Sequence, residues 1–119
     1  METLETNRLI LRTPSMDDLV LFHEYAVKPN IGPSAGWHPH QSVTESKIIL
    51  RSFITEHETW AITVKPYSAI IGTIHLKVLD FFTALEGTYE IGYSMNDFYW
   101  NKGYMTEAIK VVLDYAFKK

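Results

Sequence analysis

The amino-acid sequence predicts an α+β domain with a mostly antiparallel sheet and the element order β-α-α-β-β-β-α. Three observations lead to this prediction. One short segment near the start, and several between residues 60 and 95, alternate apolar and polar side chains as half-buried strands do. Two segments with helical periodicity follow the first strand, and a third follows the last. The 119 residues contain no linker, repeat or low-complexity stretch, so a single domain over residues 1–119 is expected.

The composition excludes several classes of function. The chain has 11 Lys and Arg against 14 Asp and Glu, a formal net charge of −3, which argues against a nucleic-acid partner. It has no cysteine, and therefore no disulfide, thiolate nucleophile or Cys-containing zinc site. No apolar run approaches the ~18 residues that span a bilayer, and residues 1–8 hold no signal-peptide core. A cytoplasmic protein without a membrane partner is the resulting expectation.

The chain is expected to begin with a strand and a capped helix. Residues 8–12 alternate polar and apolar side chains, and Thr13-Pro14 ends this strand. Ser15 is followed three residues later by Asp18, which is the spacing of a capping box at a helix start. The helix should end at residues 28–30, and its apolar stripe consists of Leu19, Phe22, Tyr25 and Ala26.

A second capped helix follows an aromatic loop. Residues 31–41 hold two Gly and two Pro, so a loop is expected there. Ser42 and Glu45 repeat the capping-box spacing. The helix that they start should run to about residue 56 and bury Ile48, Ile49 and Phe53.

The second half is expected to contain three strands and a final helix. The strands cover residues 60–64, 70–78 and 89–95, with a turn over residues 80–87 between the last two. The final helix carries one narrow polar stripe and is apolar elsewhere, so it requires cover on more than one side. The stripe consists of Glu107, Lys110, Asp114 and Lys118.

The turn before this last helix has the features of an anion site. The first turn of a helix leaves backbone N–H groups unpaired, and the helix dipole places partial positive charge there. Gly103 permits close approach of the backbone, Lys102 adds a positive charge and Thr106 adds a hydroxyl. The turn has neither the Walker spacing nor the dinucleotide fingerprint. A plain helix start containing one glycine is the alternative interpretation.

Residues Glu90-Ile91-Gly92-Tyr93 and residues 99–108 resemble the acetyl-CoA-binding motif of the GNAT-type N-acetyltransferases. The branch that they resemble includes the ribosomal-protein-alanine N-acetyltransferases, and residues 5–12, 60–62 and 71–74 are similar to its first three strands. The resemblance implies transfer of an acetyl group from acetyl-CoA to a protein N-terminus or a small-molecule amine, without a metal.

The resemblance also implies roles for individual residues. The segment before the last helix would bind the pyrophosphate of coenzyme A through Asn101, Lys102, Gly103, Tyr104, Met105 and Thr106. The end of the preceding strand would lie along the pantetheine through Tyr93, Ser94 and Met95. Trp37 and His38 in the aromatic loop would contact the acceptor, although a plain surface loop is equally compatible with the sequence.

Glu90 occupies a position where relatives often carry a general base. A base is required because an amine is protonated at pH 7 and cannot attack a thioester before it loses that proton. Gly92 and Ser94 share the face of Glu90 and leave room for a ligand. The alternative is that Glu90 is a carboxylate of the sheet with no chemical role. His38 and His40 supply at most two metal ligands, so no metal site is predicted.

Two departures from the family pattern affect the predicted function. Met105 stands where a small residue is usual, which predicts weaker binding of coenzyme A. Family domains continue beyond this helix, so the sequence is expected to lack the C-terminal part of the domain, and a homodimer would cover the last helix. Two alternatives stay open: a catalytically inactive GNAT fragment that self-associates, and an unrelated module that binds an acidic ligand.

Overall fold

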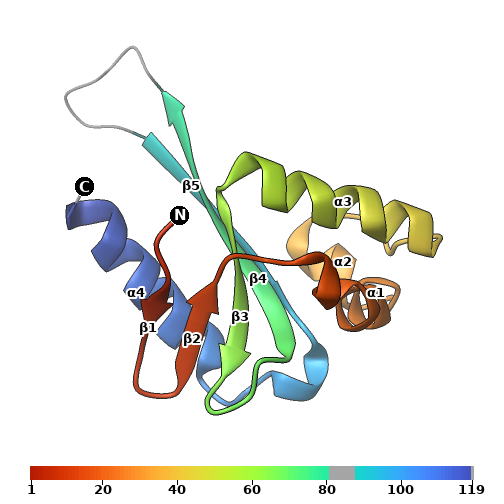
Figure 1. Cartoon of the computed structure of the whole chain (residues 1–119), viewed down its shortest axis with the longest axis horizontal. Helices are drawn as coiled ribbons and strands as arrows, with labels where there is room; N and C mark the ends of the chain where they lie inside the picture. The colour runs from red at the N-terminus through yellow and green to blue at the C-terminus, as the bar shows by residue number, and fades with distance from the viewer. Residues whose placement is uncertain (81–87, 119) are drawn as a thin grey trace.

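The computed structural model describes residues 1–80 and 88–118, which form one antiparallel sheet with helices on both faces (Figure 1). The sheet order is β1-β2-β3-β4-β5. The strands are β1 (Leu4–Glu5), β2 (Leu9–Arg12), β3 (Thr59–Val64), β4 (Ile70–Asp80) and β5 (Thr88–Met95). The helices are α1 (Leu19–Ala26), α2 (Ile31–Ala35), α3 (Val43–Glu56) and α4 (Tyr104–Lys118), with short 3-10 helices η1 (Met16–Asp18) and η2 (Asp97–Tyr99).

The α+β class and the antiparallel sheet are confirmed, and the elements differ from the expected set in two places. The strand β1 pairs with β2 although it is too short to give an alternating pattern. The helix α2 occupies the first five residues of the segment expected to be a loop, and Gly36 in the left-handed conformation ends it. The turn expected over residues 80–87 falls, from residue 81 onward, outside the described residues.

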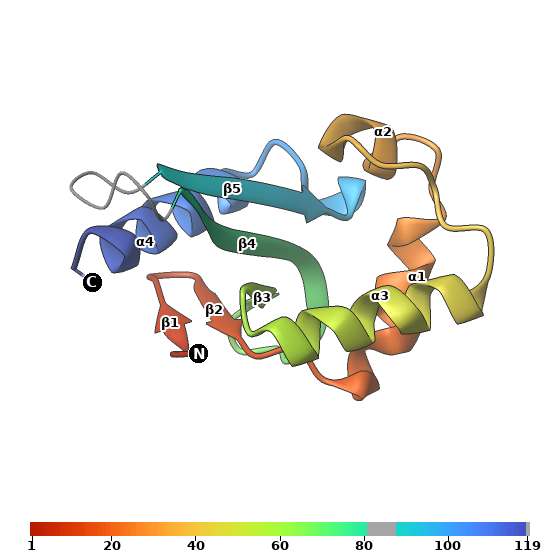
Figure 2. The same cartoon turned by 90° about the horizontal axis from the view of Figure 1, so that it is seen from above.

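One face of the sheet packs against α4, which lies on the opposite side of the sheet from α1, α2 and α3 (Figure 2). The side chains between α4 and the sheet form the main hydrophobic cluster. Its fully buried members include Leu9, Leu11, Ile62, Ile74, Ala108 and Val112. None of the described helices has the length and apolar character needed to cross a membrane.

The remaining helices build a second hydrophobic layer on the other face. Its buried residues are Phe22, Tyr25, Ile31 and Leu50, which come from α1, α2 and α3. The expectation that α3 buries Ile48 is wrong, because that side chain is 63% exposed. The buried positions of α3 are Ser46 and Leu50, one helical turn apart, which places Ile48 on the far side of the helix.

Both predicted helix starts exist, but only the first is a complete capping box. Ser15 and Asp18 satisfy each other's backbone N–H groups. The Ser42 hydroxyl accepts from the N–H of Glu45 at 3.1 Å. The Glu45 carboxylate accepts from the N–H of Gln41 at 2.6 Å, one residue before the cap.

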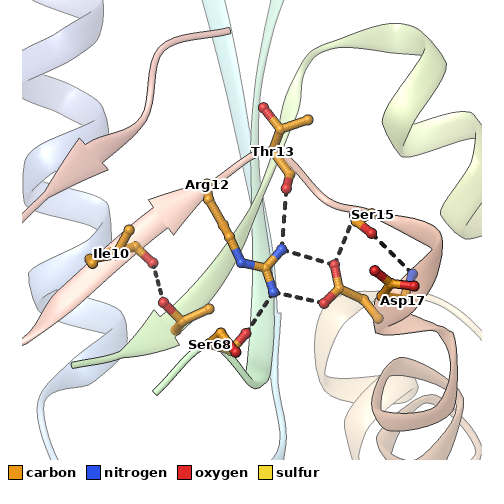
Figure 3. Close-up of polar contacts among 8 residues, drawn as sticks. Ile10, Arg12, Thr13, Ser15, Asp17 and Ser68 are labelled. Carbon is orange, nitrogen blue, oxygen red and sulfur yellow. Dashed lines mark hydrogen bonds and ion pairs between the residues drawn. The ribbon is translucent and has the colours of Figure 1, made fainter. Parts of the chain in front are cut away.

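An ion pair ties the first helical segment to the sheet (Figure 3). Arg12 of β2 donates two hydrogen bonds to Asp18, at 2.7 and 3.0 Å, and a third to the carbonyl of Ser68 at 2.7 Å. Asp18 is 6% exposed, so its charge depends on this partner. The pair therefore fixes where α1 lies on the sheet.

Candidate functional site

A cleft of about 480 Å³ opens between the end of β5, the start of α4 and α2. It brings together residues that lie far apart in sequence, since α2 ends at residue 35 and α4 begins at residue 104. Eight of the nine residues predicted to bind coenzyme A line it: Tyr93, Ser94, Met95, Asn101, Gly103, Tyr104, Met105 and Thr106. The ninth, Lys102, is exposed and does not line the cleft.

The turn that enters α4 has a backbone suited to presenting N–H groups. Asn101 and Gly103 both adopt positive φ, at 62° and 82°, and asparagine and glycine are the residues that tolerate this conformation best. The first hydrogen bond of α4 runs from the N–H of Glu107 to the carbonyl of Gly103, at 3.1 Å. The N–H groups of the three helical residues before Glu107 precede that bond and have no acceptor within the helix.

Arg8, which directly precedes β2, holds this turn in place. Its guanidinium donates to Glu107 at 2.8 Å and to the carbonyl of Lys102 at 3.0 Å, and it lies 4.5 Å from the ring centre of Tyr104. The Arg8 N–H donates to the same carboxylate at 3.0 Å, and the hydroxyl of Thr6 donates to it as well. The Arg8 side chain therefore contacts the chain both before Gly103, at Lys102, and after it, at Tyr104 and Glu107.

Glu107 is a structural acceptor rather than part of a solvent-facing polar stripe. Its burial alone would raise the pKa of the carboxyl, but the hydrogen bonds from Thr6 and Arg8 outweigh burial and lower the pKa. The ionised carboxylate pairs with Arg8 across 99 residues of sequence. No local pattern could have predicted that these two residues pair, because the contact exists only in the tertiary structure.

The β5 strand forms one border of the cleft. Asn96 N–H donates to the carbonyl of Ile71 at 2.8 Å, so the even-numbered residues at this end of β5 direct their peptide groups to β4. The peptide groups of Tyr93 and Met95 consequently point away from β4. The indole N–H of Trp100 donates to the Met95 carbonyl at 2.8 Å and fixes the end of the strand against the turn.

The side chain of Met105 has a second environment besides the cleft. It lines the cleft and also packs, partly buried, against the hydrophobic cluster between α4 and the sheet. Part of its volume is thereby taken into the core.

A second cleft of about 420 Å³ lies between α1, α3 and the face of β4 and β5 that these helices cover. Trp37 and His38, the predicted acceptor residues, both line it. The two clefts share Ala35, Tyr93 and Ser94, so they meet at the C-terminal end of β5.

Three hydroxyl groups gather at this junction. Ser94 is 8% exposed, and its Oγ lies 3.1 Å from Thr73 Oγ1 and 3.4 Å from the Tyr25 hydroxyl. Burial raises the pKa of Tyr25 to about 12, against the opposing effect of the hydrogen bonds from Ser94 and Thr73. The phenol is therefore neutral at pH 7, and the junction is polar without being charged.

Glu90 does not line either cleft. Its side chain is about half exposed, and its carboxylate lies 3.1 Å from Nε2 of His75. His75 does line the second cleft, and its ring covers Gly92: a Cβ on Gly92 would lie 2.1 Å from His75 Cε1. The room expected over Gly92 is therefore filled by an imidazole. Within the described residues, no group of three or more His, Asp or Glu is arranged to hold a metal ion.

Comparison with known proteins agrees with this geometry. The family described as "Acetyltransferase (GNAT) domain" matches residues 8–119. The chain is 29% identical, over 122 residues, to a protein named "Uncharacterized N-acetyltransferase p20" from Bacillus licheniformis, covering 98% of this chain and 67% of that protein. It spans about two-thirds of the length of the curated relatives it matches.

Solved structures with low sequence identity share the fold. A GNAT-family acetyltransferase from Bacillus anthracis superimposes with a TM-score of 0.86 at 23% identity, covering 99% of this chain and 68% of that one. An acetyltransferase described as "RimL- Ribosomal L7/L12 alpha-N-protein acetyltransferase in complex with Coenzyme A" superimposes with a TM-score of 0.72 at 13% identity, covering 96% of this chain and 67% of that one. These structures show the shared fold, and the family match over residues 8–119 shows that the chain belongs to the GNAT family of acetyltransferases.

Proposed function

We propose that the protein transfers an acetyl group from acetyl-CoA to an amine, on a protein N-terminus or a small molecule. The observation that carries the proposal is the cleft between β5 and α4, which adjoins the free N–H groups of the first turn of α4 and the outer edge of β5. The ribosomal-protein-alanine branch and a cytoplasmic location are parts of the same proposal that rest on the sequence resemblance.

The residues of the cleft fit the chemistry of coenzyme A. The N–H groups of Tyr104, Met105 and Thr106, at the positive end of the helix dipole, would donate to the diphosphate. The guanidinium of Arg8, whose charge is balanced by Glu107, would hold this turn in place through the Lys102 carbonyl. The outward peptide groups of Tyr93 and the outward N–H of Met95 would pair with the amide groups of the pantetheine as an added strand does, since the Met95 carbonyl already accepts from Trp100.

Acetyl transfer forms a C–N bond and breaks the C–S bond of the thioester, and the acceptor amine must first lose a proton. When the C–N bond forms, the nitrogen releases a second proton, and the departing coenzyme A thiolate takes it up and leaves as the thiol. We propose Glu90 as the base. Because Glu90 lines neither cleft, its action would pass through His75, whose ring lines the second cleft and whose Nε2 lies 3.1 Å from the carboxylate. His75 would accept the proton at Nδ1 and pass its Nε2 proton to Glu90, which leaves the imidazole neutral.

Calorimetry with acetyl-CoA tests the binding half of this proposal. Binding should be detectable at millimolar concentration or better, and amide shifts in NMR should be largest at residues 103–106. Residues around Ile48, on the exposed side of α3, provide the internal control because their amide signals should not move. Absence of binding, or shifts centred elsewhere, contradicts the proposal.

The catalytic half requires a second measurement. Glu90→Gln should lower kcat without changing the dissociation constant for acetyl-CoA. Glu24→Gln, on an exposed carboxylate of α1, should change neither quantity. Equal rates in the wild type and Glu90→Gln would remove Glu90 from the mechanism.

A catalytically inactive form that self-associates is the second candidate function. The observation in its favour is the apolar surface left on α4, where Phe117 is 80% exposed and Leu113 is 36% exposed. We propose a homodimer that covers this surface. Light scattering after size exclusion should give twice the chain mass of 13.7 kDa, and Phe117→Lys should restore the monomer mass. A monomeric wild type contradicts this candidate.

A further inference from the structure

The second cleft has aromatic walls. Phe22 and Phe53 meet edge to face with ring centres 5.8 Å apart, and Phe22 meets His40 in the same way at 5.5 Å. The ring centre of Trp37 lies 5.1 Å from that of His40, and Trp37 also lines the cleft. Ile49 of α3 completes this apolar lining.

The same cleft contains little charge. Glu45 is the one acidic side chain among its described lining residues, and one of its oxygens already accepts from the Gln41 N–H at 2.6 Å. His40 is held by a hydrogen bond between its Nδ1 and the Ser46 hydroxyl, at 2.7 Å. Burial lowers the pKa of His40, against the opposing effect of Glu45, so its imidazole is neutral at pH 7.

Two hydroxyl groups line the cleft on the side of the sheet. The hydroxyls of Thr73 and Ser94 are there, and Ser94 also lines the coenzyme cleft. An acceptor whose amine reaches Ser94 would therefore place the rest of its body between the aromatic walls. The volume of about 420 Å³ is within the range of small-molecule sites, roughly 300–1,000 Å³.

We infer that the acceptor is a primary amine carried on an aromatic or bulky apolar body that has no second positive charge. This inference rests on the acetyl transfer proposed above and specifies its substrate class. A polyamine would bring further ammonium groups against Phe22, Phe53 and Ile49, and the one carboxylate among the described lining residues, Glu45, already accepts a hydrogen bond from the Gln41 N–H. An amino sugar would place hydroxyls against the same walls without hydrogen-bond partners.

Two kinds of acceptor have this combination of an amine and an apolar body: a free arylalkylamine, and a peptide whose first residue has a large apolar side chain. A binding experiment on the purified chain with saturating coenzyme A separates them. The probes are phenethylamine, a Phe-Ala-Ala peptide with a free N-terminus, spermidine and glucosamine. We expect phenethylamine or the Phe-initiated peptide to bind at least about tenfold more tightly than spermidine or glucosamine, a difference of about 1.4 kcal/mol.

A pair of variants on α3 tests whether the aromatic cleft is the site. Ile49→Glu places a second carboxylate in the wall, which should weaken phenethylamine and strengthen spermidine. Ile48→Glu makes the same change on the neighbouring residue, which is 63% exposed and does not line the cleft, and should leave both affinities unchanged. Thermal unfolding of both variants checks that they fold.

The outcomes separate this inference from the proposed function. If coenzyme A binds but spermidine or glucosamine binds as well as the aromatic probes, the substrate class is wrong and acetyl transfer still stands. Equal effects of Ile49→Glu and Ile48→Glu also overturn the inference. Failure of coenzyme A itself to bind overturns both proposals.

Discussion

Replacing Gly103 by alanine should weaken coenzyme binding more than it weakens the fold. An alanine at φ 82° would adopt a left-handed conformation, which costs an L-residue about 1–2 kcal/mol. Its Cβ would lie 3.2 Å from Nη2 of Arg8, the end of a half-exposed side chain that can move. The variant therefore keeps most of the roughly 5–15 kcal/mol typical of a domain.

The expected loss of affinity for acetyl-CoA arises from the same movement of the Arg8 side chain. The new methyl group displaces the Arg8 guanidinium that bonds the Lys102 carbonyl and covers Tyr104, so the turn that presents the N–H groups shifts. We expect the dissociation constant for acetyl-CoA to rise about tenfold, which corresponds to about 1.4 kcal/mol. Urea unfolding measures the stability and calorimetric titration measures the affinity.

Gly36 provides a matched control for this variant. It has φ 89°, and a Cβ there would meet nothing within 4 Å. Gly36→Ala should therefore lower the free energy of unfolding by a similar amount and leave acetyl-CoA binding unchanged, since Gly36 does not line the cleft between β5 and α4. The reasoning is refuted if Gly103→Ala binds acetyl-CoA like the wild type, or if Gly36→Ala loses as much affinity.

Three further predictions concern stability. Folding lowers the pKa of Glu107 from 4.5, so the ionised carboxylate stabilises the fold above pH 4.5, and this stabilisation is lost as the pH falls through the folded pKa. The difference in urea midpoint between the wild type and Glu107→Gln should therefore be smaller at pH 3 than at pH 7. Arg12→Met should lower the free energy of unfolding by about 2–3 kcal/mol, less than the roughly 3–5 kcal/mol lost when one partner of a fully buried ion pair is removed. In a double-mutant cycle, adding Asp18→Asn should recover part of this loss, because the carboxylate left without its partner is then neutral; additive losses would contradict this reasoning. Gly72→Ala should cost about 3 kcal/mol or more by chemical denaturation, because its Cβ would lie 2.4 Å from the carbonyl oxygen of Ser94; a loss no larger than that of Gly36→Ala would contradict the steric argument.

The elements that could be predicted have strong local signals. Period-two alternation located β2, β3, β4 and β5, and serine at the cap position located η1 and α3. The orientation of α3 could not be predicted, because Ile48 is as apolar as Ile49 and only packing against α1 decides which one lies inside. The turn around Gly103 was predictable for the opposite reason, since its N–H groups are free as a consequence of local helix geometry.

By itself, the sequence determined the family resemblance and the order of the elements other than β1 and α2, and it predicted an anion site at the turn before α4, since each of these depends on neighbouring residues. Only the tertiary structure decided that Arg8 supports that turn through Glu107, and that His75 separates Glu90 from the clefts. Only it decided that the aromatic cleft meets the cleft between β5 and α4 at Ser94. These contacts join residues up to 99 positions apart, and strand register and helix packing, rather than local pattern, bring such residues together.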